Sequence, residues 1–340
     1  MKILLVCNGP AAGTSSNLFR HLAAQLQRCG DVRLERNDGG AGTVLQRVTR
    51  LVIANLLRIP AVVWCDCIVV HSCISLSCMT LLVARLLRRR VIAFCWDIYP
   101  TSIAGQKVAR GLSGIAQTLE AAHFRLVDKV IVPSEDFLPF VRHPNIQVMP
   151  LWPSIVVTHC SVSSDRSPRE RRRQRVQLAF AGQAGPTRGI DELLAILSRF
   201  QDVKFDLHMW GPSKPAVDAS CDGDVVRVLY HGNVTRGALA EFLRQMDFGV
   251  ISLHPLLDQP AFPSKLFDYV AADLPVLYSG PHLPSFEAML NVCQIGVRLD
   301  SRDVLWACVA RQIASDWTGA KKAFYDYTEL SSERCAKIFD

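Results

Sequence analysis

A lysine and an aspartate stand three residues apart in the stretch FPSKLFDYVAADLPVL, residues 262–277. Pro263 and Ser264 commonly begin helices, so Lys265 is expected in the first helical turn and Asp268 one turn later on nearly the same face. A lysine at the positive end of a helix is unfavourable unless an anion lies beside it. A diphosphate for Lys265 and ribose hydroxyls for Asp268 would use both side chains, as in a nucleotide-sugar site. An ion pair within a surface helix explains the same residues.

A second anion-directed pattern is AFAGQAGPTRGIDELLAIL, residues 179–197, which predicts a strand, a loop with three glycines and a helix. Gly182 and Gly185 allow a tight turn, and Arg188 adds a planar cation suited to phosphate. The amide groups at the start of the following helix add donors. A glycine loop alone is weak support for a phosphate site, and its value rises because Lys265 lies in the same half of the chain.

Polar residues also follow the apolar runs of the first half. Gly13 and Thr14 stand between the first strand and a helix, where a capped turn explains them equally well. Asp97 and Tyr99 follow the buried run VIAFCW, and a buried aspartate is costly unless it is hydrogen-bonded or used. His71 ends another run and fits a core histidine as well as a ligand contact.

Short apolar runs alternate with helix-length segments along the whole chain, which predicts parallel sheets with crossover helices. The expected strands are residues 2–7, 67–72, 90–96, 129–134, 146–151, 176–182, 205–211, 226–232, 248–253 and 275–279. The predicted organisation is an α/β fold with two doubly wound parallel-sheet domains. Their limits are a first domain at 1–160, an arginine-rich linker at 161–175, a second domain at 176–318 and a helical segment at 319–340 that returns to the first domain.

Composition narrows the function classes. The 340 residues carry a net charge of +7, but nothing interleaves aromatic and basic residues, so a nucleic-acid partner is not expected. The opening apolar run is too short for a signal peptide and residues 68–84 do not suit a membrane span. The twelve cysteines are therefore read as reduced thiols of a cytoplasmic protein. Cys65, Cys67, His71 and Cys73 could be drawn as a zinc set, but alternate residues of a strand point to opposite faces, so no metal site is predicted.

Four ordered blocks of the second half make a family resemblance specific. They are FAGQAGPTRGIDELL, LHMWGPS, VLYHGNVTRGALAEFLRQMDFGVISL and PSKLFDYVAADLPVL. With them the chain resembles GT-B glycosyltransferases, and among these the retaining enzymes of glycosyltransferase family 4, over essentially its full length. The resemblance implies two Rossmann-like domains that face each other across a cleft.

The resemblance also implies roles for individual residues. Arg188 and Lys265 match the residues that contact the donor diphosphate, and Asp268 matches the acidic residue that binds the ribose. The donor-binding set then consists of Gly182, Gly185, His231, Gly232, Ser264, Lys265 and Asp268. The expected acceptor-binding residues, from the loops that follow the first-half strands, are Gly13, Thr14, His71 and Tyr99. Asp97 is the candidate for acceptor contact or general base, beside Arg188 and Lys265 as catalytic cations.

The chain departs from the family pattern at three places. The first of two glutamates in the last block falls on Pro260, so the contact with the donor sugar must differ or be lost. Gln183 stands where an arginine often follows the loop glycine. Trp96 stands where many relatives have histidine before the aspartate.

The expected reaction is transfer of a sugar from a UDP- or GDP-linked donor to a saccharide acceptor, with no metal or other cofactor because the two cations supply the positive charge. Arginines at 47, 50, 58 and 84–90 favour attachment to the anionic inner face of the cytoplasmic membrane and a lipid-linked acceptor in cell-surface polysaccharide synthesis. Exposed arginines on core helices are the simpler alternative. The rival functions are a donor-binding subunit without catalysis, suggested by Pro260, and a sugar-nucleotide epimerase.

Overall fold

In the computed structural model the chain divides into two compact units, which are described separately. The first unit comprises Met1–Val156, Asp258–Phe262 and Thr328–Asp340, and the second comprises Val157–Leu257 and Pro263–Tyr327. The structure describes residues 1–8, 14–37, 43–71, 77–96, 98, 118, 121–152, 175–200, 202–212, 224–257, 260–299 and 317–340. Residues 161–174 of the expected linker lie outside these ranges.

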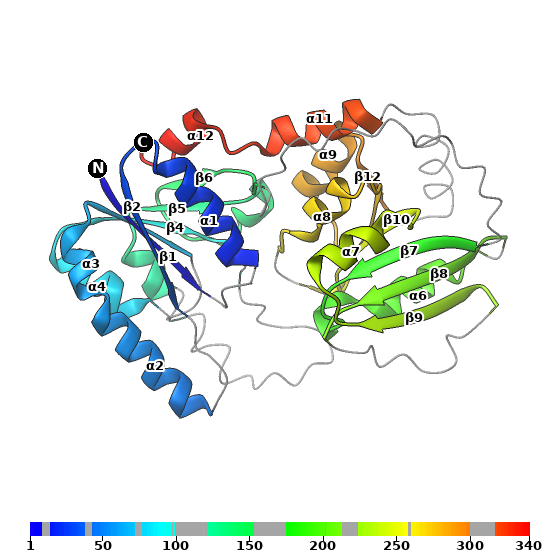
Figure 1. Cartoon of the computed structure of the whole chain (residues 1–340), viewed down its shortest axis with the longest axis horizontal. Coiled ribbons are helices and arrows are strands. Elements are labelled where there is room, and N and C mark those ends of the chain that lie inside the picture. The colour runs from blue at the N-terminus through cyan, green and yellow to red at the C-terminus, as the bar shows by residue number, and fades with distance from the viewer. Residues whose placement is uncertain are drawn as a thin grey trace. The chain divides into compact units, whose positions relative to one another are not determined.

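The first unit is built on a six-stranded parallel sheet with the order β2-β1-β3-β4-β5-β6 (Figure 1). The strands are β1 (Lys2–Asn8), β2 (Asp31–Asn37), β3 (Cys67–His71), β4 (Arg90–Phe94), β5 (Lys129–Val132) and β6 (Ile146–Val148). Every residue of β3 and β5 is buried, because helices cover both faces of a parallel sheet. From β1 the chain adds β2 on one side of the sheet and, from β3 onward, adds strands on the other side.

Helices of the first unit lie on both faces of this sheet. They are α1 (Thr14–Leu26), α2 (Val44–Leu57), α3 (Ile59–Trp64), α4 (Cys78–Leu86) and α12 (Ser332–Ala336), with a short 3₁₀ turn η1 at Glu135–Phe137. Helix α12 packs on α1, while α2, α3 and α4 pack on one another. The crossover helices α1 and α4 lie on opposite faces, because right-handed connections lead from β1 to β2 on one side and from β3 to β4 on the other.

The second unit is a six-stranded parallel sheet with the order β12-β11-β10-β7-β8-β9. Its strands are β7 (Arg175–Ala181), β8 (Lys204–Trp210), β9 (Val226–Gly232), β10 (Phe248–Ser252), β11 (Val276–Ser279) and β12 (Gly296–Arg298). Its helices are η2 (Pro186–Arg188), α6 (Ile190–Leu197), α7 (Arg236–Leu243), α8 (Lys265–Ala271), α9 (Pro284–Val292) and α11 (Trp317–Thr328). The chain adds β8 and β9 on one side of β7 and then β10, β11 and β12 on the other, so the switch point of this doubly wound sheet lies between β7 and β10.

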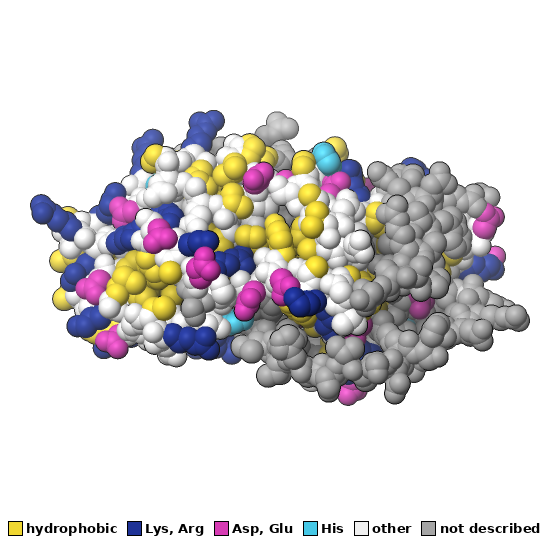
Figure 2. All heavy atoms as spheres, turned by 90° about the horizontal axis from the view of Figure 1, so that it is seen from above, with side chains coloured by type: hydrophobic (Ala, Val, Ile, Leu, Met, Phe, Trp, Pro, Cys, Tyr) yellow, Lys and Arg dark blue, Asp and Glu magenta, His cyan; other side chains and the backbone are white. Residues whose placement is uncertain are grey.

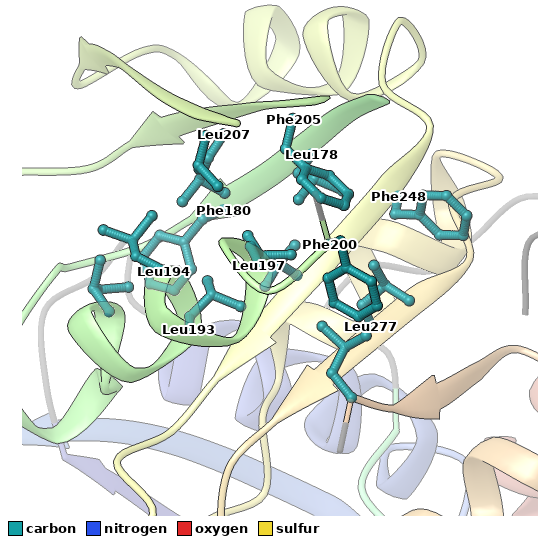
Figure 3. Close-up of a cluster of buried hydrophobic side chains, with 14 of the residues drawn as sticks. Leu178, Phe180, Leu193, Leu194, Leu197, Phe200, Phe205, Leu207, Phe248 and Leu277 are labelled. Carbon is teal, nitrogen blue, oxygen red and sulfur yellow. The ribbon is translucent and has the colours of Figure 1, made fainter. Parts of the chain in front are cut away.

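One face of this sheet packs on α6 through a cluster of apolar side chains (Figure 3). Leu193, Leu194 and Leu197 of α6 recur at helical spacing and meet Phe205 and Leu207 from β8. Alternate residues of β7 and β8 point to the opposite face, where α7 and α8 lie and where Asp206 and His208 are found.

The predicted fold class is confirmed, and so are all ten expected strands. Two strands, β2 and β12, were not predicted. Both lie at sheet edges. The sequence of β2, DVRLERN, is polar and partly exposed because an edge strand needs little apolar surface, and β12 has three residues.

The C-terminal segment returns to the first unit, as predicted. Helix α11 belongs to the second unit, where Phe324 packs on Phe267 of α8. In the first unit, Arg334 donates to the carbonyl of Pro150, and the Lys129 ammonium donates to the carbonyl of Lys337 at 3.0 Å. No helix among the described residues has the length and apolar character that crossing a bilayer requires.

Candidate functional site

Helix α8 is anchored at the switch point of the second sheet by Tyr269. The phenol hydroxyl accepts a hydrogen bond from the Ala181 amide at 2.9 Å and donates one to the Val250 carbonyl at 3.1 Å. Gly249 makes room for the ring, since a Cβ there would lie 2.4 Å from it. Burial raises the pKa of Tyr269, so the hydroxyl stays protonated. One buried side chain thus connects the end of β7 and the middle of β10 to α8.

Lys265 lies across Gly182, one helical turn before Tyr269. A Cβ on Gly182 would lie 2.5 Å from the Lys265 Cε atom and 3.3 Å from its Nζ atom. Gly182 follows β7 directly and has a φ of +157°, which further favours glycine. The loop glycine and the helix lysine of the sequence analysis are therefore in contact, although they are far apart in the sequence.

Three glycines continue the strands at this edge of the sheet. Gly182 donates its amide to the carbonyl of Trp210 at 2.7 Å, and Gly211 donates to the carbonyl of Gly232 at 3.0 Å. A Cβ on Gly211 would lie 2.0 Å from the Gly182 oxygen. Gly232 has a φ of +73°. The ends of β7, β8 and β9 thus form a closely packed backbone surface, with the Lys265 side chain across Gly182.

The loop that carries Arg188 is fixed to the end of β10. Thr187 accepts a hydrogen bond from the His254 amide at 2.9 Å, and the Ser252 hydroxyl donates to the Gly189 carbonyl at 3.0 Å. Gly189 has a φ of +54°, and a Cβ there would lie 2.8 Å from the backbone of His254. Arg188 is thereby held at the carboxyl end of β7 and β10, the same end as Lys265. A Cβ on Gly185 would meet nothing within 4 Å.

Helix α8 presents Lys265 and Asp268 outward because its other residues face the core. Leu266, Phe267 and Val270 are buried, while Lys265 and Asp268 are partly exposed. Ser264 stands at the position before the helix, as expected from the sequence, but its side chain makes no capping hydrogen bond. Both predicted ligand contacts of α8 therefore lie on the accessible side of a firmly packed helix.

His231 ends a hydrogen-bonded chain that begins at Asp206. The Gln177 amide group donates to Asp206 at 3.1 Å, and its oxygen lies 2.8 Å from His208 Nε2. His208 Nδ1 lies 2.9 Å from His231 Nε2. Because the Gln177 oxygen can only accept, His208 Nε2 carries its proton and His231 Nε2 donates to His208 Nδ1. The neutral His231 ring then presents Nδ1 as an acceptor.

The pKa shifts of these groups favour neutral rings for His208 and His231. Burial lowers the pKa of both His208 and His231. Burial alone would raise the pKa of Asp206, but hydrogen bonds from Arg227, Gln177 and Arg175 outweigh it and lower the pKa. Asp206 is therefore a carboxylate at neutral pH, and the glutamine orientation is fixed by it.

Aromatic rings surround His231. The Trp210 ring lies 5.0 Å from it, centroid to centroid, with 19° between the planes, and Phe242 of α7 lies 6.4 Å from it. His208 and Trp210 were not among the predicted site residues, although the block LHMWGPS contained both. Tyr269 and Gly211 were also missed, since their importance depends on contacts with distant strands.

The candidate residues of the first unit are only partly described. Gly13, Asp97 and Tyr99 lie outside the described residues, and Thr14 begins α1 without a described side chain. His71 is 5% exposed at the end of β3, and its ring lies 4.9 Å from Trp96.

A second buried histidine of the first unit, His123, was not predicted. It is 1% exposed, neither ring nitrogen has a hydrogen-bond partner, and burial followed by the charge of His71 lowers its pKa to about 4. Both histidines are therefore buried in the core of this unit.

No group of three histidine, cysteine, aspartate or glutamate side chains in the described ranges could bind a metal ion. Cys65 and Cys67 are buried thiols whose pKa values burial raises to about 11 and about 12. Cys73 of the zinc set weighed above falls outside the described residues.

Comparison with solved structures identifies the architecture. A glycosyltransferase from Rickettsia africae aligns over 100% of this chain and 98% of its own, with a TM-score of 0.64 and 11% identity. WaaG, a glycosyltransferase involved in lipopolysaccharide biosynthesis, aligns over 99% of each chain with a TM-score of 0.58 and 14% identity. HepE from Anabaena, solved with UDP, aligns over 100% and 98% with a TM-score of 0.59 and 13% identity. The chain has the GT-B fold.

The GT-B architecture confirms the fold that the four sequence blocks implied. No protein-family model and no curated protein sequence matches the chain. At these identities the likeness concerns the fold, and function must be argued from the residues of the site.

Proposed function

We propose that this GT-B protein transfers a sugar from a nucleoside diphosphate sugar to a saccharide acceptor. The observation that carries the proposal is the crossing of Lys265 over Gly182, at the switch point where ligands of doubly wound sheets bind. The sequence places a glycine where any side chain would displace the lysine. The structural neighbours are named as glycosyltransferases, and one of them was solved with UDP, which supports the same reaction class.

In the proposed mechanism Lys265 and Arg188 contact the diphosphate and stabilise the charge that grows on it as the glycosidic bond breaks. Asp268 accepts hydrogen bonds from the ribose hydroxyls. His231, through Nδ1, accepts a hydrogen bond from the base or ribose, while Trp210 and Phe242 shape that end of the site. Two cations on fixed elements make a metal ion unnecessary in this proposal.

Retention of configuration and the identity of the acceptor are further parts of the proposal. Retention is supported by the resemblance to family 4, and Asp97 is the proposed acceptor contact or base. A lipid-linked saccharide at the inner face of the cytoplasmic membrane is supported by the arginines of the first unit and by the likeness to WaaG, a protein of lipopolysaccharide biosynthesis.

The test is to incubate the protein with UDP-, GDP-, ADP- and dTDP-sugars, with and without a polyprenyl-diphosphate-sugar extract, and to measure release of the nucleoside diphosphate. Release should occur with one donor, and Lys265→Ala should lower it about 100- to 1,000-fold, as expected for loss of one charge-stabilising donor. Lys204→Ala is the matched control, because Lys204 is a partly exposed lysine of the same unit that pairs with Asp224. Equal rates in both variants would refute the assigned role of Lys265.

A second function, nucleotide binding without turnover, is favoured by Pro260. This residue stands where family members carry a glutamate, so the position has no carboxylate. The proline is buried. Tight binding of one nucleotide, measured by calorimetry, with no diphosphate release under any acceptor would select this function over transfer.

A further inference from the structure

Helix α2 of the first unit buries polar side chains near its C-terminal end and leaves most of its apolar side chains exposed, together with some polar ones. Asn55 and Arg58, at the end of the helix, are buried, whereas Leu45, Val48 and Leu56 are exposed. These three recur at the spacing of one helical face. The exposed fractions of Leu45 and Leu57 are each 76%.

Arg58 explains why the helix can sit this way. Its guanidinium donates to Glu35 at 2.8 Å, to Asn37 at 2.7 Å and to Thr80 at 3.2 Å. Asn55 in turn accepts a 2.6 Å hydrogen bond from Thr80. The expectation that Arg58 contributes to a basic surface is therefore wrong. It is a buried structural residue, 2% exposed, that ties the end of α2 to β2 and α4.

The neighbouring helices continue the apolar surface. Val63 of α3 is 52% exposed, and Met79, Leu82 and Leu86 of α4 follow the spacing of one helical face. Helices α2, α3 and α4 pack against one another. Eleven of the nineteen large apolar side chains that are exposed among the described residues belong to this segment: Leu45, Val48, Val52, Ile53, Leu56, Leu57, Val63, Met79, Leu82, Leu86 and Leu87. We call this surface the outer helical face.

The outer helical face is basic as well as apolar. Besides the buried Arg58, residues 43–96 contain six arginines and no lysine, and Arg50, Arg85 and Arg88 are exposed. Their one acidic residue, Asp66, accepts a hydrogen bond from the backbone of Lys2. At the edge of α3, Arg33 lies over the Trp64 ring at 4.0 Å. By contrast, acidic and basic side chains are interspersed on the side of the unit that Figure 2 shows.

A pocket of about 550 Å³ lies at the end of α4, lined by Arg85, Arg88, Arg89, Arg90 and Asp128. Arg85 pairs with Asp128 at 2.5 Å, and Arg90 donates to the carbonyl of Phe339. Arg89 donates to the Val63 carbonyl at 2.7 Å, while its buried Nε has no hydrogen-bond partner. The pocket therefore carries an excess of positive charge with one acidic side chain to offset it.

Arg88 stands where glycine is usual. It has a φ of +53°, and the following amide, of Arg89, donates to the Ala84 carbonyl at 2.8 Å, as in a Schellman motif at a helix end. A residue other than glycine is unfavourable in this left-handed conformation, so the arginine is present here at a cost to the backbone. A cation near a helix C-terminus is favourable, but it could stand at a neighbouring position without that cost.

We propose that the outer helical face docks on a bilayer of anionic phospholipid, with its leucines among the acyl chains and the arginine pocket around headgroup phosphates. This inference extends the membrane location within the proposed function. An apolar face with basic residues and almost no acidic ones is complementary to an anionic interface, and a soluble protein partner would commonly offer pairs of both signs. Helices α2 and α4 both begin at the carboxyl end of the first sheet, so docking would bring lipid beside the expected acceptor loops.

The experiment is flotation of the full chain with vesicles of phosphatidylcholine alone or mixed with phosphatidylglycerol, in the absence of donor and acceptor. The unmodified protein should float with the mixed vesicles. Leu45→Gln combined with Leu86→Gln should weaken binding at least about tenfold, since two exposed leucines no longer enter the interface. Arg88→Gln should weaken binding to the mixed vesicles about fivefold and leave the remaining affinity less sensitive to salt.

Val292→Gln and Arg199→Gln are matched controls, because Val292 is 77% exposed and Arg199 is exposed, both in the second unit. Both controls should float as the unmodified protein does. Flotation of the leucine variant at the unmodified level, or no flotation of the unmodified protein, would overturn the proposal. A dimer in sedimentation that the leucine variant converts to a monomer, without flotation, would assign the face to a second copy and also overturn it. Since no sugar donor is present, failure here leaves the transfer reaction separately testable.

Discussion

Helices α8 and α2 differ in the side chains that they bury. Helix α8 buries Leu266, Phe267 and Val270 and turns Lys265 and Asp268 outward. Helix α2 buries Asn55, with Arg58 at its end, and turns leucine and valine outward.

Both helices nevertheless use one buried polar side chain to fix their position. Tyr269 bonds α8 to β7 and β10, and Arg58 bonds the end of α2 to β2 and α4. The comparison teaches that amphipathicity alone does not tell which face of a helix is the inner one. A polar anchor with satisfied hydrogen bonds can fix a helix in place while its apolar side chains stay exposed.

The largest effect is expected from Arg58→Ala, which tests whether this arginine positions α2. Removing the guanidinium leaves Glu35 and Asn37 without their buried cation, so we expect the free energy of unfolding of the first unit to fall by about 3–5 kcal/mol. Urea unfolding followed by tryptophan fluorescence would measure the change. Arg50→Ala is the control, because Arg50 is exposed on the same helix and should change stability by less than about 0.5 kcal/mol. A loss of stability as small in Arg58→Ala as in the control would mean that apolar contacts, not the arginine, position α2.

The next largest effect is expected at the glycine beneath Lys265. In Gly182→Ala the new Cβ would displace the lysine chain, whose far end can move, so the protein should fold but the ammonium should leave its position. A displacement of about 1 Å in a catalytic group can cost about 100-fold in rate. We therefore expect donor turnover to fall by roughly that factor, measured as nucleoside diphosphate release.

Gly237→Ala is the matched control in the same unit. A Cβ at Gly237, near the start of α7, would meet nothing within 4 Å, and alanine is the better helix former. Turnover of this variant should stay within about twofold of the unmodified protein, as for a substitution that makes no new contact. Equal losses in both variants would show that the replacement of a glycine as such, and not the position of Lys265, lowers the rate.

The sequence predicted the parallel sheets because the central strands of both are continuous apolar runs. It missed β2 because an edge strand such as DVRLERN has no such run. In the site, Lys265 and Asp268 could be found from their spacing within one helix. The contact of Lys265 with Gly182 and the hydrogen bond of Tyr269 to Ala181 could not, since the hydrogen-bonded pair is 88 residues apart. Arg58 was placed on the wrong side of its helix because its partner Glu35 lies on an unpredicted strand.

The smallest effect concerns the anchor of α8. Tyr269→Phe keeps the ring against Gly249 but removes the hydroxyl, which leaves the Ala181 amide and the Val250 carbonyl without this partner. An unsatisfied buried group costs about 1–3 kcal/mol, so the second unit should lose stability by that amount in thermal unfolding. Tyr327→Phe, at a tyrosine 47% exposed, should change it by less than about 0.5 kcal/mol. If Tyr269→Phe unfolds as the control does but donor turnover falls, the hydroxyl serves to align Lys265 and apolar packing holds α8. If stability falls and turnover at lower temperature does not, a buried polar side chain anchors α8 as Arg58 anchors α2.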